Sequence, residues 1–518
     1  MSTVILVKAL RELTDKVSYH IPNRESEGYG MSTAAVKKLA DQGTQVILTC
    51  DNGISAIEPI SLAKELGMTV VVLDHHEVVF SEAEHGARQV ILPAADAIIN
   101  PKQPTCAYPF KLLCAGGITY QFVRQLYSTV GRKWDKWAEL LEFAALATVC
   151  DVVDLLDENR IIVKNGLEAM NQTANPGLRA LIRVTGMEGK VLGSFHLGFV
   201  LGPCINASGR LEVADLAVEL FLTEDEEEAA EIAGRLHELN TQRRAMTAEG
   251  VERVTESLAP LVADQHKVLV VYDETIHESI AGIIAGRVRE RYNLPTIILT
   301  RGRETAKGSG RSIENYNLFE ELLRCRDILQ AFGGHPMAAG LSLSPENIAE
   351  LRRRLNENCS LSEDDVIPVL KIDKQLPLEL VSFPLVEGLA LMEPYGKGNA
   401  TPLFGEKGVQ VMSVSILGKQ KSVLRLLCKL RGQRAQLEAI CFDGVDKFTA
   451  MITGAYGPDG MKMVLMGQLK DLLLDMVFSV GINEFAGRRS LQAQLKDFRL
   501  SEAVYAQTAG VISDNQIS

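Results

Sequence analysis

Two adjacent histidines follow an acidic residue at the end of a short apolar segment. Residues 70–73 are rich in β-branched side chains and run directly into Asp74, His75 and His76. Such a run is typical of a buried parallel strand, and open α/β sheets bind ligands at the carboxyl ends of their strands. A carboxylate beside two imidazoles is a combination suited to metal-assisted hydrolysis. The alternative is a strand that ends in a polar turn, and this segment alone leaves both interpretations open.

A second apolar strand, residues 45–50, ends in another carboxylate, Asp51. Between the two strands, residues 55–67 have the apolar spacing of a helix and close on a glycine that suits the end of a helix. The unit is therefore strand, helix, strand, and a right-handed crossover makes the strands parallel. We expect Asp51 and the Asp74–His76 cluster at one edge of one sheet.

A third apolar run, residues 141–154, is interrupted by Asp151. A buried or half-buried carboxylate is costly unless it is paired or bound to a cation. Carboxylates favour Mg²⁺ or Mn²⁺, and an imidazole ligand favours Mn²⁺ between these two. The three carboxylates and the histidine pair together predict a site for divalent cations.

The second half of the chain offers groups that could bind phosphate. Residues 308–312 combine two glycines with Ser309, Arg311 and Ser312, and residues 333–335 combine two glycines with His335. Glycines allow the backbone to approach a ligand closely, and a guanidinium binds phosphate through two parallel hydrogen bonds. A pair of tight turns without a ligand is the alternative.

Residues 411–437 contain basic residues and no acidic ones. Apolar and polar side chains alternate there as in a curled antiparallel sheet, and a basic barrel suits a nucleic-acid backbone. The alternative is a basic sheet edge that prevents aggregation. The basic residues are Lys419, Lys421, Arg425, Lys429, Arg431 and Arg434.

Composition agrees with a multidomain globular protein. The chain has 518 residues, of which 46% are hydrophobic and 23% charged, so several domains are expected. The first residues lack the basic region of a signal peptide. No apolar run reaches the length of about 20 residues that is needed to span a bilayer. Nine cysteines without a Cys-x-x-Cys pair favour reduced thiols and the cytoplasm. The net charge of −12 does not exclude a nucleic-acid partner, because charge distribution matters more.

These motifs together resemble the DHH phosphoesterase superfamily, and its bacterial RecJ branch in particular. The resemblance rests on Asp51-Asn-Gly, Asp74-His-His, Asp151 and residues 21–30, 100–104, 202–211, 308–312 and 332–340. It implies an α/β fold in which a parallel-sheet DHH domain (1–235) and a bridging helix (236–260) precede a smaller α/β DHH-associated domain (261–358). An OB-like β-barrel (362–505) would follow.

The resemblance implies a 5′-to-3′ exonuclease that degrades single-stranded DNA in repair and recombination. Asp51, His75 and Asp151 match metal ligands for Mn²⁺ or Mg²⁺, His76 a catalytic or phosphate-facing histidine, and Asp74 a supporting carboxylate. The implied partners are single-stranded DNA, a single-strand-binding protein and a helicase. The residues that match nucleic-acid-binding positions are Asn206, Arg210, Arg287, Ser309, Arg311, Ser312 and His335.

The first motif of this family, Asp-x-Asp-x-x-Gly, is not matched in this sequence. Residues 1–13 look instead like the helix that follows that loop, and the first acidic residue is Glu12. The resemblance therefore also leaves an alternative expectation, a single-stranded nucleic-acid-binding protein of the same fold with impaired catalysis. A third possibility is a DHH phosphodiesterase that acts on short oligonucleotides or cyclic dinucleotides. The barrel-like segment 366–500 argues against it, because such enzymes typically lack a third module.

Overall fold

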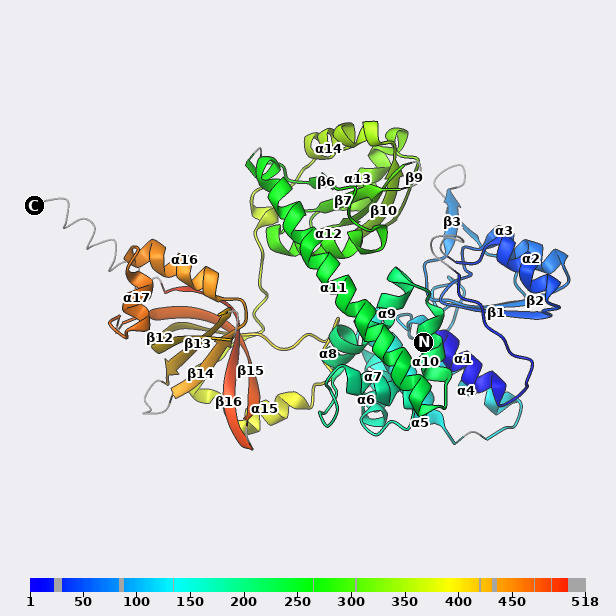
Figure 1. The fold of residues 1–518 in the computed structure, drawn as a ribbon, viewed down its shortest axis with the longest axis horizontal. Helices are drawn as coiled ribbons and strands as arrows, with labels where there is room; N and C mark the ends of the chain where they lie inside the picture. The colour runs from blue at the N-terminus through cyan, green and yellow to red at the C-terminus, as the bar shows by residue number, and fades with distance from the viewer. Residues whose placement is uncertain are drawn as a thin grey trace, which may run out of the picture. The chain divides into compact units, whose positions relative to one another are not determined.

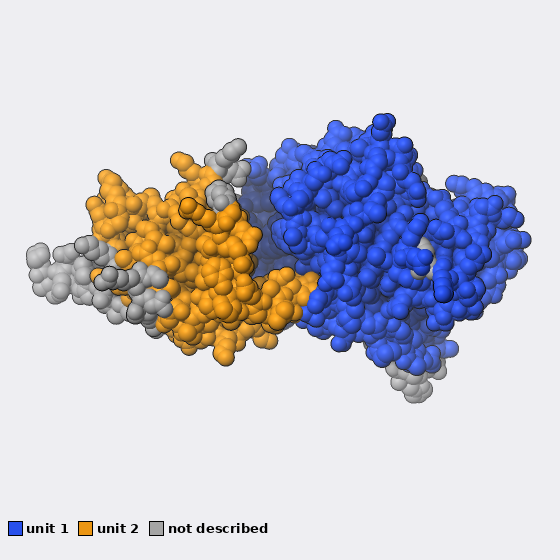
Figure 2. All heavy atoms as spheres, turned by 90° about the horizontal axis from the view of Figure 1, so that it is seen from below, with its two compact units in different colours: residues 1–368, 396–398 blue, residues 369–395, 399–518 orange. Residues whose placement is uncertain are grey.

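The structure is a computed structural model that describes residues 1–22, 30–82, 88–133, 135–263, 265–302, 305–418, 421–430, 436–469, 471–485 and 487–501. The chain divides into two compact units, drawn in different colours in Figure 2. Unit 1 comprises Met1–Pro368 and Gly396–Gly398, and unit 2 comprises Val369–Tyr395 and Asn399–Ser518. Among the described helices, none is long and apolar enough to cross a membrane.

The first sheet of unit 1 contains three parallel strands in the order β1-β2-β5. The strands are β1 (Val46–Cys50), β2 (Thr69–Leu73) and β5 (Ala97–Ile99), with α3 (Ile57–Glu65) between the first two and α2 (Thr33–Asp41) before them. Gly67 follows α3 with a φ of +79°, which a glycine adopts easily. The predicted strand–helix–strand unit is therefore confirmed. A separate hairpin pairs β3 (Val79–Glu82) with β4 (Arg88–Ile91).

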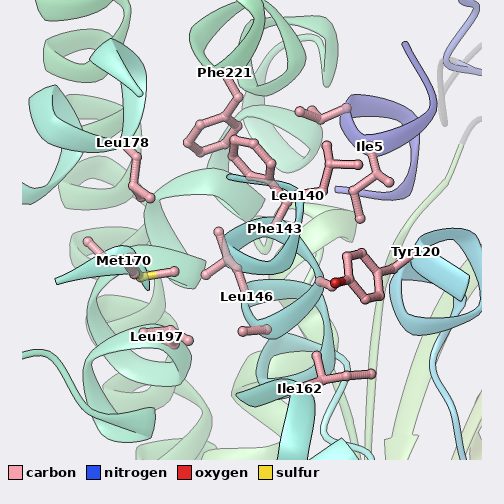
Figure 3. Packing of buried hydrophobic residues seen from close by; sticks show 14 of the residues in the cluster. Ile5, Tyr120, Leu140, Phe143, Leu146, Ile162, Met170, Leu178, Leu197 and Phe221 are labelled. Atoms are coloured by element: carbon pink, nitrogen blue, oxygen red, sulfur yellow. The ribbon is translucent and has the colours of Figure 1, made fainter. Parts of the chain in front are cut away.

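A layer of helices forms the main core of unit 1. The third apolar run is helix α5 (Trp137–Cys150), whose Leu140, Phe143 and Leu146 are fully buried. Figure 3 shows these side chains packed among residues from the neighbouring helices. The neighbours are α1 (Ser2–Arg11), α4 (Ala115–Thr129), α6 (Asp157–Met170), α7 (Pro176–Val184) and α10 (Asp215–Leu222).

Two further helices connect this core to the second sheet (Figure 1). Helix α9 (Gly202–Leu211) follows the short helix α8 (Ser194–His196) and the π-helical turn η1 (Leu197–Leu201). Helix α11 (Glu226–Ala263) is the predicted bridging helix, but it begins at Glu226 rather than at residue 236. Glu226, Glu227 and Glu228 form its first turn, where negative charge complements the helix dipole.

The second sheet has the strand order β6-β7-β8-β10-β9. The strands are β6 (Leu269–Tyr272), β7 (Thr296–Arg301), β8 (Ala306–Arg311), β9 (Ala331–His335) and β10 (Ala338–Leu343), with helices α12 (Glu278–Tyr292), α13 (Leu318–Arg324) and α14 (Ile348–Glu357). Residues 308–311 and 333–335 are thus in strands, so the alternative that these segments form a pair of tight turns is wrong. A Cβ on Gly308 would lie 2.5 Å from Leu299, so this glycine serves close packing rather than a ligand.

Unit 2 contains the predicted barrel. Its strands follow the order β12-β13-β14-β16-β15, and pairing of β12 with β15 closes the ring. The strands are β12 (Phe404–Leu417), β13 (Val423–Lys429), β14 (Gln436–Cys441), β15 (Leu473–Phe485) and β16 (Arg488–Leu500), with β11 (Lys374–Gln375) added beside β12. The helices are α15 (Phe383–Ala390), α16 (Val445–Tyr456) and α17 (Gly460–Leu465). Unit 2 also contains the short 3₁₀ turn η5 (Leu378–Leu380), whereas the 3₁₀ turns η2 (Arg326–Ile328), η3 (Pro345–Asn347) and η4 (Asp364–Val366) belong to unit 1.

Three residues that we expected within the barrel module belong to unit 1 instead. Gly396–Gly398 lies against the segment that follows α5, and the Leu155 amide donates to the Lys397 carbonyl oxygen at 2.7 Å. Gly398 has a φ of +74°, and a Cβ there would lie 2.9 Å from the Asp154 side chain. Glycine is required at this position for both reasons.

Replacing Gly308 tests the packing role of this glycine. In Gly308→Ala, the new methyl would meet Leu299 and Leu341 at 2.5 and 2.8 Å, and such overpacking costs about 1–3 kcal/mol of unfolding free energy. Gly333→Ala is the matched control, because no atom lies within 4 Å of its Cβ position. Urea unfolding measures both variants, and equal stability of the two would contradict this packing role.

Buried Glu142 predicts a stability that depends on pH. It is 4% exposed, accepts from the Thr173 hydroxyl at 2.7 Å, and burial raises its pKa to about 7. Because the folded pKa exceeds the unfolded one, its contribution is favourable at low pH and is lost as pH rises from about 4.5 to about 7. The difference in unfolding free energy between Glu142→Gln and the wild type should therefore shift in favour of the variant by about 3 kcal/mol when the pH rises from 4 to 8. Exposed Glu168→Gln, measured by the same unfolding curves, should show no such gain.

Candidate metal and phosphate site

The buried carboxylate of Asp74 organises the histidine pair. Asp74 is 1% exposed, and its Oδ1 accepts from the amide of His75 at 2.7 Å and from Nδ1 of His76 at 2.6 Å. Its Oδ2 accepts from the Ile54 amide at 2.9 Å, which ties the end of β2 to the turn after β1. Burial alone would raise the pKa of Asp74, but these hydrogen bonds outweigh burial and lower it. Asp74 is therefore ionised and holds the proton of His76 on Nδ1.

His75 lies between two carboxylates from different parts of the chain. Its Nε2 is 3.1 Å from Oδ1 of Asp51, and its Nδ1 is 3.6 Å from Oδ2 of Asp151. Ligand atoms of Asp51, His75 and His76 all lie within 4.8 Å of one another. The structure thus brings together Asp51, Asp74, His75, His76 and Asp151, as the sequence predicts.

The turn after β1 presents Asp51 toward this group. The Asp51 amide donates to the Leu73 carbonyl, which continues the sheet by one residue, and Asp51 has a φ of +64°. Gly53 follows with a φ of +113°, and a Cβ there would lie 2.5 Å from the Thr49 hydroxyl. The sharp turn leaves Asp51 more than half exposed, so its carboxylate can reach a ligand.

Asp151 comes from the end of helix α5 and completes the cluster. It is the C-cap of that helix, and the next residue, Val152, has a φ of +56°. Burial raises the pKa of Asp151, His75 opposes that shift, and the negative charge of Asp51 adds to it. The carboxylates of Asp51 and Asp151 therefore repel each other across His75. A divalent cation would relieve this repulsion, and the oxygen and nitrogen donors suit Mn²⁺ or Mg²⁺.

A pocket of about 150 Å³ opens beside His76 and is lined by Asn52, Gly53, Ile54, Asp74 and Glu77 among others. Buried Asn100 supports the wall by donating to the His76 carbonyl at 2.9 Å. The pKa of His76 is raised, chiefly by its hydrogen bond to Asp74 and against the effect of burial. A proton on both ring nitrogens would suit an anionic ligand in this pocket.

Helix α9 carries the two predicted phosphate-binding residues of the first half. Asn206 is exposed, and Arg210 donates through Nη1 to the carbonyl of Ser279 at 2.6 Å. Ser279 lies in the first turn of α12, whose N-cap is His277. This contact brings Arg210 to the helix that covers the second sheet.

On the second sheet, Ser309, Arg311 and His335 share one face. Arg311 and His335 both pair with Ala338, one on each side of β10, and directly opposite residues of an antiparallel pair point the same way. Arg311 donates from Nη1 to the Ser309 hydroxyl at 3.1 Å. A Cβ on Gly282 of α12 would lie 2.8 Å from the Arg311 guanidinium, so α12 packs closely against this face.

Two other predicted phosphate-binding residues, Ser312 and Arg287, differ from Ser309, Arg311 and His335 in their surroundings. Ser312 is 1% exposed, and its hydroxyl donates to the Tyr316 carbonyl at 2.6 Å, so it stabilises a turn instead of facing a ligand. Arg287 is two-thirds exposed and lies 3.8 Å from Glu290 on the same helix. The interpretation of Ser312 as a phosphate ligand is therefore corrected.

The bridging helix also carries an arginine pair, Arg243 and Arg244, that the sequence motifs do not point to. Arg243 donates from Nη2 to the Asn240 side chain at 2.8 Å. Burial lowers its pKa, and so do the charges of Arg244 and Arg287. Clustered like charges of this kind suit an anionic ligand. Adjacent arginines in a long polar helix were the available signal, but a bridging helix carries such residues on any solvated face.

The basic segment of the barrel is only partly described. Arg425 lies 2.5 Å from Glu438 on the neighbouring strand, so its charge is paired within the sheet. Lys429, at the end of β13, is exposed. Lys419, Arg431 and Arg434 lie outside the described residues, as does most of segment 21–30.

Metal binding tests the cluster directly. His75→Ala should abolish measurable Mn²⁺ binding in calorimetric titration, because it removes the group between Asp51 and Asp151. Asp74→Asn should weaken binding by about 10- to 100-fold, the usual effect of losing a residue that orients a ligand. Asp96→Asn, which removes an ion pair with Lys64 instead, is the control. Unchanged affinity in the His75 variant would contradict this site.

Comparison with known protein families assigns three segments. Residues 1–148 match the N-terminal domain of the DHH family, residues 265–361 the DHHA1 domain, and residues 372–497 the RecJ OB domain. These matches lie in the order in which the structure places the first sheet, the second sheet and the barrel.

Curated relatives and solved structures agree with this assignment. The chain is 34% identical to the single-stranded-DNA-specific exonuclease RecJ of Bacillus subtilis over 97% of its own length but only 60% of that protein. It is 30% identical to RecJ of Haemophilus influenzae over 95% of this chain and 84% of that protein. The crystal structure of Thermus thermophilus RecJ with Mn²⁺ shares the fold, with a TM-score of 0.76, 24% identity, and coverage of 97% of this chain and 67% of that one. The chain therefore belongs to the RecJ family.

Proposed function

We propose that this chain is an exodeoxyribonuclease that degrades single-stranded DNA in the 5′-to-3′ direction by metal-dependent phosphodiester hydrolysis. The observation that carries the proposal is the position of His75 between Asp51 and Asp151. The relatives named above are single-stranded-DNA-specific exonucleases, and the chain spans less than two thirds of the first of them.

The residues of this chain would share the chemistry as follows. Asp51, His75 and Asp151 would hold Mn²⁺ or Mg²⁺, which supplies Lewis acidity for the scissile phosphate and the leaving oxygen. Asp74 keeps the proton of His76 on Nδ1. The raised pKa of His76 favours a second proton, on Nε2, which His76 would donate to a phosphate oxygen.

Phosphates farther along the strand would lie on the arginine-bearing surface of the same unit. Arg210 and Arg311 both meet helix α12, and Ser309 accepts a hydrogen bond from Arg311. Arg243 adds a partly buried guanidinium. A charged guanidinium that is already held in place binds phosphate with little further loss of side-chain entropy. Asn206 and His335, both exposed, would contribute polar contacts at the edges.

The same proposal extends to the setting of the reaction. We place it in the cytoplasm during DNA repair and recombination, with a helicase that opens duplexes and a single-strand-binding protein that covers the product strands. All nine cysteines are free thiols, which agrees with a reducing compartment.

A strand blocked at one end tests the direction of degradation. An oligonucleotide with a 5′ protein block should resist the chain in the presence of Mn²⁺, and the same strand blocked at its 3′ end should be shortened from its 5′ end. His75→Ala should lower the rate at least about a hundredfold, because the metal site is lost. Asp96→Asn should leave the rate unchanged.

Two outcomes would contradict the proposal. One is resistance of the 3′-blocked strand together with degradation of the 5′-blocked strand. The other is tight binding of single-stranded DNA by the wild-type chain without turnover at any Mn²⁺ or Mg²⁺ concentration, which is the behaviour of a binding protein with impaired catalysis.

A further inference from the structure

Two phenylalanines on the segment that packs against the end of helix α5 are exposed and stacked on each other. Phe195 and Phe199 are 63% and 73% exposed, and their ring centroids lie 5.0 Å apart with an angle of 22° between the ring planes. Phenylalanine is among the residues most often buried, so two such rings in contact on a surface mark an interaction site. We name this pair the aromatic ledge.

His196 stabilises the turn that carries the aromatic ledge. The ring of His196 stands edge-on to Phe195 at 5.8 Å, and Nδ1 of His196 accepts from the Gly193 amide at 2.9 Å. Phe199 lies in the π-helical turn η1, a distortion that occurs frequently at functional sites. Burial lowers the pKa of His196, and the charge of Lys190 lowers it further, so this ring is neutral at neutral pH.

The turn that carries the ledge packs directly on the end of helix α5. A Cβ on Gly198 would lie 3.4 Å from Val149, and a Cβ on Gly202 would lie 2.4 Å from the sulfur of Cys150. Cys150 immediately precedes Asp151 in the sequence. The backbone of the ledge is therefore fixed against the residues that lead into the metal cluster, and it continues into α9 with Asn206 and Arg210.

The size and chemistry of the ledge favour a nucleobase over a protein surface. Two phenyl rings can bury about 150–250 Å² each, which together is less than the about 800 Å² per partner of a stable protein interface. Aromatic rings stack on any base irrespective of its sequence. The positive charge of Lys190 acts on this turn and would complement the phosphate of the same nucleotide.

We propose that Phe195 and Phe199 form a stacking surface for the bases of a single strand whose backbone passes the metal cluster. This inference rests on the proposed function and adds a base-binding subsite to it. Phosphate contacts alone would bind a strand without bases equally well, whereas the ledge makes affinity depend on the bases themselves. The ledge would also hold one stacked nucleotide at a fixed distance from Asp151, because both are anchored on α5.

The test compares two oligomers that differ only in their bases. Binding of the full chain to a fluorescent oligothymidylate and to an abasic oligomer of equal length is measured by anisotropy in EDTA, so that no turnover occurs. The double variant Phe195→Ala/Phe199→Ala should weaken oligothymidylate binding by about tenfold or more, as expected for loss of base stacking. Binding of the abasic oligomer should change by less than about twofold. Phe199→Trp should retain affinity, and its indole fluorescence should be quenched by oligothymidylate.

Ile161→Ala removes another exposed apolar side chain, 59% exposed on α6, and should leave both affinities unchanged. Equal weakening of both oligomers, or no change in either, would overturn the proposal. A change in sedimentation of the double variant without a base-dependent loss would also overturn it and would identify the ledge as a contact between copies of the chain. Degradation by the wild-type chain is scored separately, so failure of the nuclease assignment and failure of the ledge give different results.

Discussion

One buried carboxylate determines the geometry of the candidate site. Asp74 is almost inaccessible, yet it is ionised, because four hydrogen bonds from two amides of the histidine pair, the His76 ring and the Ile54 amide compensate its burial. These bonds join the end of β2 to the turn after β1 and orient the His76 ring at the same time. A charge buried in this way is tolerated only while its partners stay in place. The positions of the His75–His76 pair and of the turn after β1 therefore depend on Asp74, although Asp74 would not contact the metal.

The charges of unit 1 are separated into an anionic cluster and a cationic one. Asp51 and Asp151 repel each other across His75, and Arg243 is close enough to Arg244 and Arg287 that their charges lower its pKa. Arg287 lies 3.8 Å from Glu290, whereas Arg243 donates to the neutral side chain of Asn240. A cation at the first and a phosphate backbone at the second would remove both repulsions. Like charges gathered on a folded surface cost stability, and a bound ligand of opposite charge would offset that cost.

The sequence predicts the elements better than the contacts. Apolar β-branched runs and helical spacing in residues 45–76 correctly place Asp51 and His75 at one edge, because parallel strands share their carboxyl edge. The sequence does not reveal the roles of Gly308 and Ser312, because glycine and serine occur in packed strands and turns as well as in phosphate-binding loops. Arg243 and Phe199 lie on helices whose polar and apolar patterns show nothing unusual. Their significance comes only from tertiary neighbours, which a local pattern does not contain.

The short segment Gly396–Gly398 prevents the chain from being cut into its two units at a single point. It accepts the Leu155 amide hydrogen bond and lies against Asp154, although the residues on both sides of it belong to unit 2. Cutting the polypeptide after Pro368 would therefore remove part of the first unit together with the second. The Leu155 amide would lose its hydrogen-bond acceptor, and Asp154 would lose its packing contact with Gly398. Unit 1, which contains the carboxylates, is therefore not a continuous segment of the chain. It includes three residues that follow its main segment in the sequence.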